Sequence, residues 1–165
     1  MNAPEVLLRQ AVWPEDTDTV AALFAEYAAS LGIDLGFQDF AGELAHLDRH
    51  YGAAHGAVFL AVRERLALGC VGLRTFDAQA GIAELKRLYV RPQGRGHALG
   101  RRLSEQALAH AALLGYRRVR LDTLPDMHAA QALYAALGFV EIAPYRFNPI
   151  PGTRFMECVL PPAQG

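Results

Sequence analysis

Residues 90–103 read Val90-Arg91-Pro92-Gln93-Gly94-Arg95-Gly96-His97-Ala98-Leu99-Gly100-Arg101-Arg102-Leu103, and this stretch joins a strand pattern to a helix pattern. Apolar and polar residues largely alternate over 82–90, which is typical of a strand. A proline and two glycines predict a loop over 91–97. From Leu99 to Leu114 apolar residues recur at helical spacing, and Gly115 marks the end of that helix. The stretch is therefore a strand-to-helix connection.

The small residues of this connection suit a phosphate group. A helix N-terminus presents backbone N–H groups without intrahelical partners, and these favour an anion. Gly96, Ala98 and Gly100 keep side-chain bulk away from those groups, while Arg95 and Arg101 add positive charge. A tight turn with surface arginines is the alternative. The Gly-Lys-Ser/Thr ending of a P-loop and the third glycine of a dinucleotide-binding loop are both missing.

The rest of the chain can be assigned outward from this connection. A strand at 118–121 follows the helix, so the segment 82–121 has the length of a right-handed parallel βαβ crossover. Before it, two apolar strands form a hairpin whose connection ends at Gly69. Strands are predicted over 5–12, 58–63, 70–76, 82–90, 118–121, 139–142 and 154–160, and helices over 14–31, 38–50, 99–114 and 126–137. The predicted fold class is α/β, with a mixed, mostly antiparallel sheet, one central parallel strand pair and flanking helices.

Length and composition exclude several classes of protein. The chain has 165 residues, a net charge of −1 and 52% hydrophobic residues, so we expect one domain over 1–165 and no disordered or low-complexity class. Neutral charge argues against a nucleic-acid partner. No apolar run reaches the roughly 20 residues that span a bilayer, and no signal peptide is visible, so we expect a cytoplasmic protein without a membrane partner.

Single residue types limit the chemistry further. Cys70 and Cys158 are too few for a disulfide framework or a metal site, and the histidines show no metal-ligand grouping, so no metal is expected. Lys86 is the only lysine against fifteen arginines, which makes each arginine weaker evidence of phosphate binding than usual.

Several motifs occur together in a characteristic order. Gln93-x-x-Gly96-x-Ala98 matches the pattern Arg/Gln-x-x-Gly-x-Gly/Ala, and a second register beginning at Arg95-Gly96 describes the same loop. The further motifs are Glu84-Leu85-Lys86-Arg87-Leu88-Tyr89-Val90, Asp122-Thr123, Ala130-x-x-Leu133-Tyr134-x-x-Leu137-Gly138-Phe139 and Tyr145-x-x-Asn148-Pro149-x-Pro151-Gly152. With these motifs the chain resembles the GNAT superfamily of N-acetyltransferases, and its ending is similar to an uncharacterised bacterial branch.

The resemblance implies acetyl-CoA as co-substrate and a place for it. In the family the fourth and fifth strands splay apart, and acyl-CoA lies in the opening. The backbone of Leu88, Tyr89 and Val90 would pair with the pantetheine arm. The pyrophosphate would meet the segment of Arg95, Gly96, His97, Ala98, Leu99, Gly100 and Arg101. For His97 the alternative is a variable surface residue.

The resemblance also implies catalytic roles. Tyr134 matches a tyrosine that lies near the thioester sulfur and protonates the departing thiolate; the alternative is a packed tyrosine whose hydroxyl bonds backbone. Glu84 matches a glutamate that accepts the amine proton, often through water; the alternatives are a solvated strand residue or a pair with Lys86 or Arg87. A fourth-strand amide near Leu88 would polarise the carbonyl. Neither cysteine lies in a nucleophile motif, which favours direct attack by the amine.

The acceptor is expected to be a primary amine of a small molecule or a peptide. In the family the first two helices shape its pocket, so Glu26 and Asp34 would hold the cation and Tyr27 and Phe37 would line the pocket; a solvated helix face with core aromatics is the alternative. Asp122 is a weaker candidate that could instead cap the strand end. Other functions remain open: a non-catalytic module that binds or senses acyl-CoA, or acetylation of a protein or of aminoacyl-tRNA. A homodimer would be common in the family.

Overall fold

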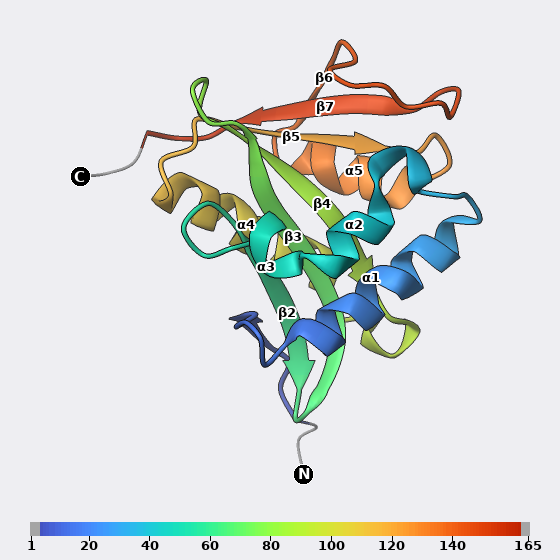
Figure 1. The fold of residues 1–165 in the computed structure, drawn as a ribbon, viewed down its shortest axis with the longest axis vertical. Helices are drawn as coiled ribbons and strands as arrows, with labels where there is room; N and C mark the ends of the chain where they lie inside the picture. The colour runs from blue at the N-terminus through green and yellow to red at the C-terminus, as the bar shows by residue number, and fades with distance from the viewer. Residues whose placement is uncertain (1–3, 163–165) are drawn as a thin grey trace.

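A computed structural model describes residues 4–162 and contains a seven-stranded sheet with the order β1-β2-β3-β4-β5-β7-β6 (Figure 1). Neighbouring strands are antiparallel except β4 and β5, which are parallel. The strands are β1 (Leu7–Gln10), β2 (Ala57–Arg63), β3 (Leu66–Asp77), β4 (Ile82–Val90), β5 (Arg118–Thr123), β6 (Val140–Ile142) and β7 (Arg154–Val159). The α/β class and the mixed sheet with one parallel pair are therefore confirmed.

Helices cover both faces of the sheet, and each face has its own apolar core (Figure 1). On one face lie α4 (Leu99–Leu113) and α5 (His128–Ala136), and on the other lie α1 (Thr17–Leu31), α2 (Phe40–Ala45) and α3 (Leu47–His50). Two 3₁₀ turns, η1 (Gly36–Gln38) and η2 (Pro92–Gly94), lie in the connections. None of the helices described in residues 4–162 is long and apolar enough to cross a membrane.

The helical pattern found from Leu99 onward forms the centre of the first core. Leu99, Leu103, Ala107 and Ala111 are each at most 2% exposed and pack against the sheet. Burial of a leucine side chain contributes about 1.5–3 kcal/mol, so this stripe anchors α4 firmly. The βαβ unit of β4, α4 and β5 is thereby fixed, and with it the position of the loop before α4.

The helix predicted over 38–50 is not continuous. The single helix predicted over 38–50 is divided into η1, α2 and α3, because Asp39 is left-handed (φ 51°) and His46 leaves helical geometry (ψ 47°). The division lets Glu43 of α2 reach the middle of the sheet while Leu47 of α3 packs into the second core. The periodicity alone continues through both breaks and does not reveal them.

The hairpin of β2 and β3 turns earlier than predicted. Its connection is Glu64-Arg65, with Glu64 at φ 58°, and Gly69 lies inside β3. A Cβ at Gly69 would lie 2.8 Å from the carbonyl oxygen of Tyr89 in β4. The glycine therefore permits close approach of two strands rather than a turn.

Candidate active site

The parallel pair of β4 and β5 is bonded only at one end. Its register runs Ile82↔Arg118, Ala83↔Val119 and Glu84↔Arg120, and no partner follows in the described chain. Beyond this point a cavity opens between residues 85–88 of β4 and residues 121–124 at the end of β5. Its remaining lining comes from Tyr27, Leu31, Ile33, Leu35, Phe37, Gln38, Tyr134 and Asn148. The splayed central pair implied by the resemblance is thus present.

A β-bulge shapes the β4 wall of this cavity. Register with β3 passes from Gly72↔Lys86 to Cys70↔Tyr89, so Arg87 and Leu88 together oppose one residue. Arg87 adopts φ 60°, a left-handed conformation that costs a non-glycine residue about 1–2 kcal/mol. Two hydrogen bonds from its guanidinium to Glu43, of 3.1 and 2.9 Å, hold it there. Such locally strained backbone is common at functional sites, where it redirects peptide groups.

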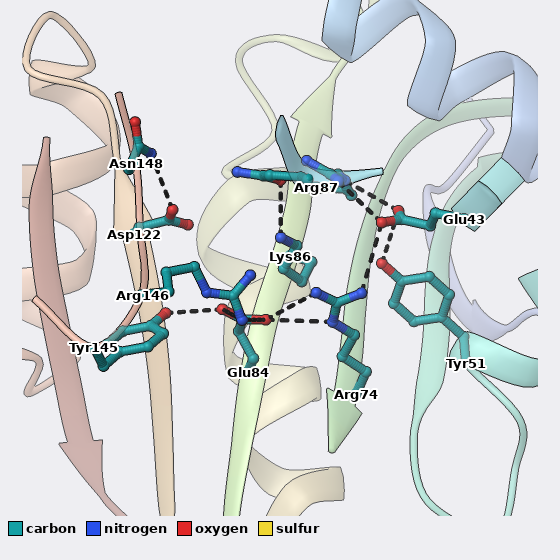
Figure 2. A network of polar contacts seen from close by, with 11 residues as sticks. Glu43, Tyr51, Arg74, Glu84, Lys86, Arg87, Asp122, Tyr145, Arg146 and Asn148 are labelled. Carbon is teal, nitrogen blue, oxygen red and sulfur yellow. Dashed lines mark hydrogen bonds and ion pairs between the residues drawn. The ribbon is translucent and has the colours of Figure 1, made fainter. Parts of the chain in front are cut away.

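A buried ion cluster lies beside the cavity (Figure 2), and we define it as Glu43, Arg74, Glu84, Arg87 and Arg146. Glu43 pairs with Arg87 at 2.9 Å and with Arg74 at 3.7 Å. Glu84 pairs with Arg74 at 3.3 Å and with Arg146 at 2.8 Å. Burial raises the pKa of Glu43, but the Arg87 guanidinium, together with the positive charges of Lys86 and Arg74, outweighs this and leaves the pKa below its usual value.

Glu84, the predicted general base, is completely buried in this cluster and is not among the residues that line the cavity. Tyr145 also donates a hydrogen bond of 2.8 Å to it. Its salt-bridge partners are thus Arg74 and Arg146 rather than Lys86 or Arg87. Tyr145 and Arg146 belong to the segment between β6 and β7, and no local pattern indicates that this segment folds back over β4.

Tyr134, the predicted acid, lies on α5 and lines the cavity. Its ring packs against Phe139 with centroids 5.6 Å apart. Burial raises the pKa of the phenol well above its usual value, so the hydroxyl stays protonated at neutral pH. Within residues 4–162 no hydrogen bond of this hydroxyl is found, so the backbone bond considered as the alternative is not seen.

Lys86 received no role from the sequence, yet it lines the cavity and is only 4% exposed. Its ammonium donates a hydrogen bond of 3.0 Å to the side-chain oxygen of Gln38. Burial lowers the pKa of Lys86 to about 8. Its being the only lysine of the chain was the one signal that could have singled it out.

The five acceptor candidates separate into two groups. Tyr27, Phe37 and Asp122 line the cavity, and Asp122 accepts a hydrogen bond of 3.2 Å from Asn148. Glu26 and Asp34 do not line it. Glu26 binds Arg91, with one contact of 2.9 Å, and exposed Asp34 accepts the Gly36 amide at 2.8 Å.

The loop before α4 has the geometry that an anion needs. Gly96 and Ala98 both have positive φ, of 87° and 53°, and α4 begins without a side-chain cap. The amides of the first helical turn, at Leu99, Gly100 and Arg101, therefore keep the unpaired donors of a helix start. Arg95 and His97 are exposed beside them. These unpaired donors favour an anion, and the unpaired edge of β4 leads from them to the cavity.

In the described part of the chain, no three histidine, cysteine, aspartate or glutamate side chains are grouped so that they could hold a metal ion.

Comparison with known proteins agrees with this geometry. The model of the acetyltransferase (GNAT) family matches residues 19–139. An uncharacterized N-acetyltransferase of Schizosaccharomyces pombe is 42% identical over 145 residues, which cover 87% of this chain and 88% of the relative.

Solved structures share the fold. A GNAT-family acetyltransferase from Staphylococcus aureus has a TM-score of 0.78 at 19% identity. The superposed region covers 95% of this chain and 100% of the Staphylococcus aureus chain. The acetyltransferase yncA of Salmonella typhimurium, solved with acetyl-CoA, has a TM-score of 0.69 at 18% identity. The superposed region covers 98% of this chain and 97% of the yncA chain. Because the family model spans most of the chain and the yeast relative is similar over nearly all of it, the chain belongs to the GNAT family of acetyltransferases.

Proposed function

We propose that this chain transfers the acetyl group of acetyl-CoA to the primary amine of a small molecule or a peptide by direct attack. Family membership makes it an acetyl-CoA-dependent acyltransferase. The observation that carries the proposal is the cavity at the splay of β4 and β5, which combines a protonated, unbonded tyrosine hydroxyl with an unpaired strand edge.

Backbone groups would hold most of the co-substrate. The edge of β4 at Leu88, Tyr89 and Val90 would pair with the pantetheine amides, and the segment from Arg95 to Arg101 would receive the pyrophosphate. The uncapped start of α4 supports this assignment, because its free N–H groups and dipole favour an anion. The peptide group near Leu88, redirected by the bulge at Arg87, would polarise the thioester carbonyl.

The reaction forms a C–N bond to the acceptor and breaks the C–S bond of the thioester. Tyr134 would give its proton to the departing thiolate. Both cysteines are buried, and burial raises the pKa of each thiol, which keeps them poor nucleophiles. Their burial supports direct transfer without a covalent enzyme intermediate.

The proton lost by the amine needs a carboxylate. Glu84 stays the proposed general base and would act through a water, because its own carboxylate does not line the cavity. Asp122 does line it and would hold the ammonium before the proton leaves. Tyr27 and Phe37 would form the apolar wall around the acceptor.

The test is CoA release from acetyl-CoA with a panel of amines, amino acids, polyamines and peptides. Tyr134→Phe should lower kcat by about 10²-fold or more while acetyl-CoA still binds, as measured by calorimetry. Tyr116→Phe is the matched control: its hydroxyl bonds Thr75 and the His55 carbonyl, outside the cavity, so kcat should not change.

One result would overturn the proposal, and another would remove one residue from it. Acetyl-CoA binding without CoA release for any amine would point to a sensing module. An unchanged kcat in Tyr134→Phe would remove Tyr134 from the chemistry.

A further inference from the structure

Not every charged group around the cavity has a salt-bridge partner. The acidic groups are Glu43, Glu84 and Asp122, and the basic groups are Arg74, Lys86, Arg87 and Arg146. The three arginines are engaged by the glutamates of the buried ion cluster. This leaves Lys86 and Asp122, which both line the cavity and have no oppositely charged side chain within salt-bridge distance among the described residues.

Lys86 carries one of these two unpaired charges. An ammonium has three donor hydrogens, and the one bond found for Lys86 goes to the neutral amide of Gln38. At 4% exposure the side chain has little water to replace the missing partners. A buried charge without a counter-ion is costly, so a negative group entering the cavity here would be strongly favoured.

Asp122 lies on the other side of the cavity, on β5. Its carboxylate accepts one hydrogen bond, from the Asn148 side-chain amide at 3.2 Å. The Ile150 amide donates to the other end of that side chain at 2.9 Å, which fixes the orientation of Asn148. Figure 2 shows the Asp122 carboxylate pointing across the gap toward Lys86. The cavity therefore has a cationic and an anionic wall.

We propose that the acceptor is an amino acid or a closely related amine that carries an acidic group, with its carboxylate on Lys86 and its ammonium on Asp122. The inference rests on the proposed acetyl transfer and names its substrate class. A zwitterion of this kind satisfies both walls together, and it places the nitrogen on the β5 side of the cavity.

The same charges disfavour other amines. A polyamine would bring a second cation toward Lys86, and like charges close together in a desolvated site repel strongly. A simple alkylamine would leave Lys86 unpaired in the complex as well. Selectivity would thus come from a penalty on the wrong acceptors as much as from attraction of the right ones.

The test compares matched acceptors that differ by one carboxylate. The pairs are phenylalanine with phenethylamine and lysine with cadaverine, and CoA release is the readout. The proteins are wild type, Lys86→Met and a charge control, Arg65→Met, which lies in the exposed β2–β3 turn. Wild type and Arg65→Met should prefer at least one amino acid over its decarboxylated amine by about 10-fold or more in kcat/KM. In Lys86→Met this preference should fall by about 10-fold through a higher KM for the amino acid, with an unchanged KM for acetyl-CoA.

The variant Asp122→Asn tests the second contact, that between Asp122 and the ammonium of the acceptor. It should raise the KM of the amino acid and of its decarboxylated amine alike, because both carry the ammonium that Asp122 receives. Equal turnover of amino acid and amine by wild type, or an undiminished preference in Lys86→Met, would overturn the inference and leave acetyl transfer standing. Absence of CoA release with every amine would instead defeat the proposed function itself.

Discussion

Ala98 precedes α4 in a left-handed conformation, at φ 53°, that favours glycine. Its side chain is exposed, so nothing in the packing compensates for the strain. We expect Ala98→Gly to raise the free energy of unfolding by about 0.5–1 kcal/mol, measured by urea denaturation. The control is Ala109→Gly on the exposed face of α4, which should lower it by about 1 kcal/mol. Destabilisation by both changes would contradict the assigned backbone conformation.

Lys86 makes stability depend on pH. Its pKa is about 8 in the fold, lowered first by burial and then by Arg87 and Arg74, against the opposing effects of Glu84 and Asp122. An unfolded lysine has a pKa near 10.4, so between these pH values the unfolded chain binds more protons and the free energy of unfolding rises with pH.

The variant Lys86→Met removes this proton uptake. From pH 7 to pH 10, wild type should gain about 2 kcal/mol of unfolding free energy relative to Lys86→Met. Urea denaturation of both proteins at the two pH values measures the difference, and the tyrosines and cysteines common to both cancel. Parallel pH profiles would show that Lys86 titrates normally in the fold.

The buried ion cluster joins elements that are distant in the chain. Through Glu43 it ties α2 to the bulge of β4, and through Arg146 it ties the β6–β7 segment to the middle of that strand. Glu43→Gln leaves the Arg87 guanidinium without its ionised partner, so we expect a loss of about 3–5 kcal/mol in the free energy of unfolding. Glu105→Gln breaks only the exposed pair with Arg101 and should cost less than about 0.5 kcal/mol. A loss in Glu43→Gln as small as that in Glu105→Gln would mean that Arg87 does not depend on an ionised partner at this position.

The elements show what local sequence could predict. The helix from Leu99 follows from periodicity, because it buries one continuous face. The strand over 82–90 is present as predicted, although residues 82–87 are all buried and both of its faces are therefore covered. The helix over 38–50 fails for the opposite reason: its breaks at Asp39 and His46 serve contacts with β4, more than thirty residues away. The partners of Glu84 escaped prediction likewise, since Arg146 reaches it across a sequence separation of 62.

In the candidate site too, some residues could be predicted from local sequence and others could not. Tyr134 and the loop before α4 could be named from motifs, because the family pattern lies in contiguous residues. Lys86 and its lack of a counter-ion could not, since charge balance in a cavity depends on which distant groups are already paired.

At the scale of the whole molecule, acetyl-CoA should stabilise the fold by binding only the native chain. At about 100 times Kd the gain is about 2.7 kcal/mol, which corresponds to about 5–10 °C in Tm for a chain of this size. Gly100→Ala tests where the binding energy arises. A Cβ at Gly100 meets only the Leu133 side chain, at 3.5 Å, so the unliganded Tm should be equal or higher.

The same methyl group would stand at the proposed pyrophosphate site. We therefore expect Gly100→Ala to show a smaller acetyl-CoA-dependent rise in Tm than wild type in a thermal shift assay. An equal rise would place the pyrophosphate away from the start of α4.

The solitary lysine also has a practical consequence. These 165 residues offer amine-reactive reagents a single side chain, and that side chain lies in the wall of the cleft. Labelling followed by mass spectrometry would therefore read one lysine side chain, on a peptide separate from the one that carries the α-amino group. The rate of labelling would report how accessible Lys86 is in the cavity. A bound compound that slows the labelling would show that the acceptor side is occupied, before any turnover is measured.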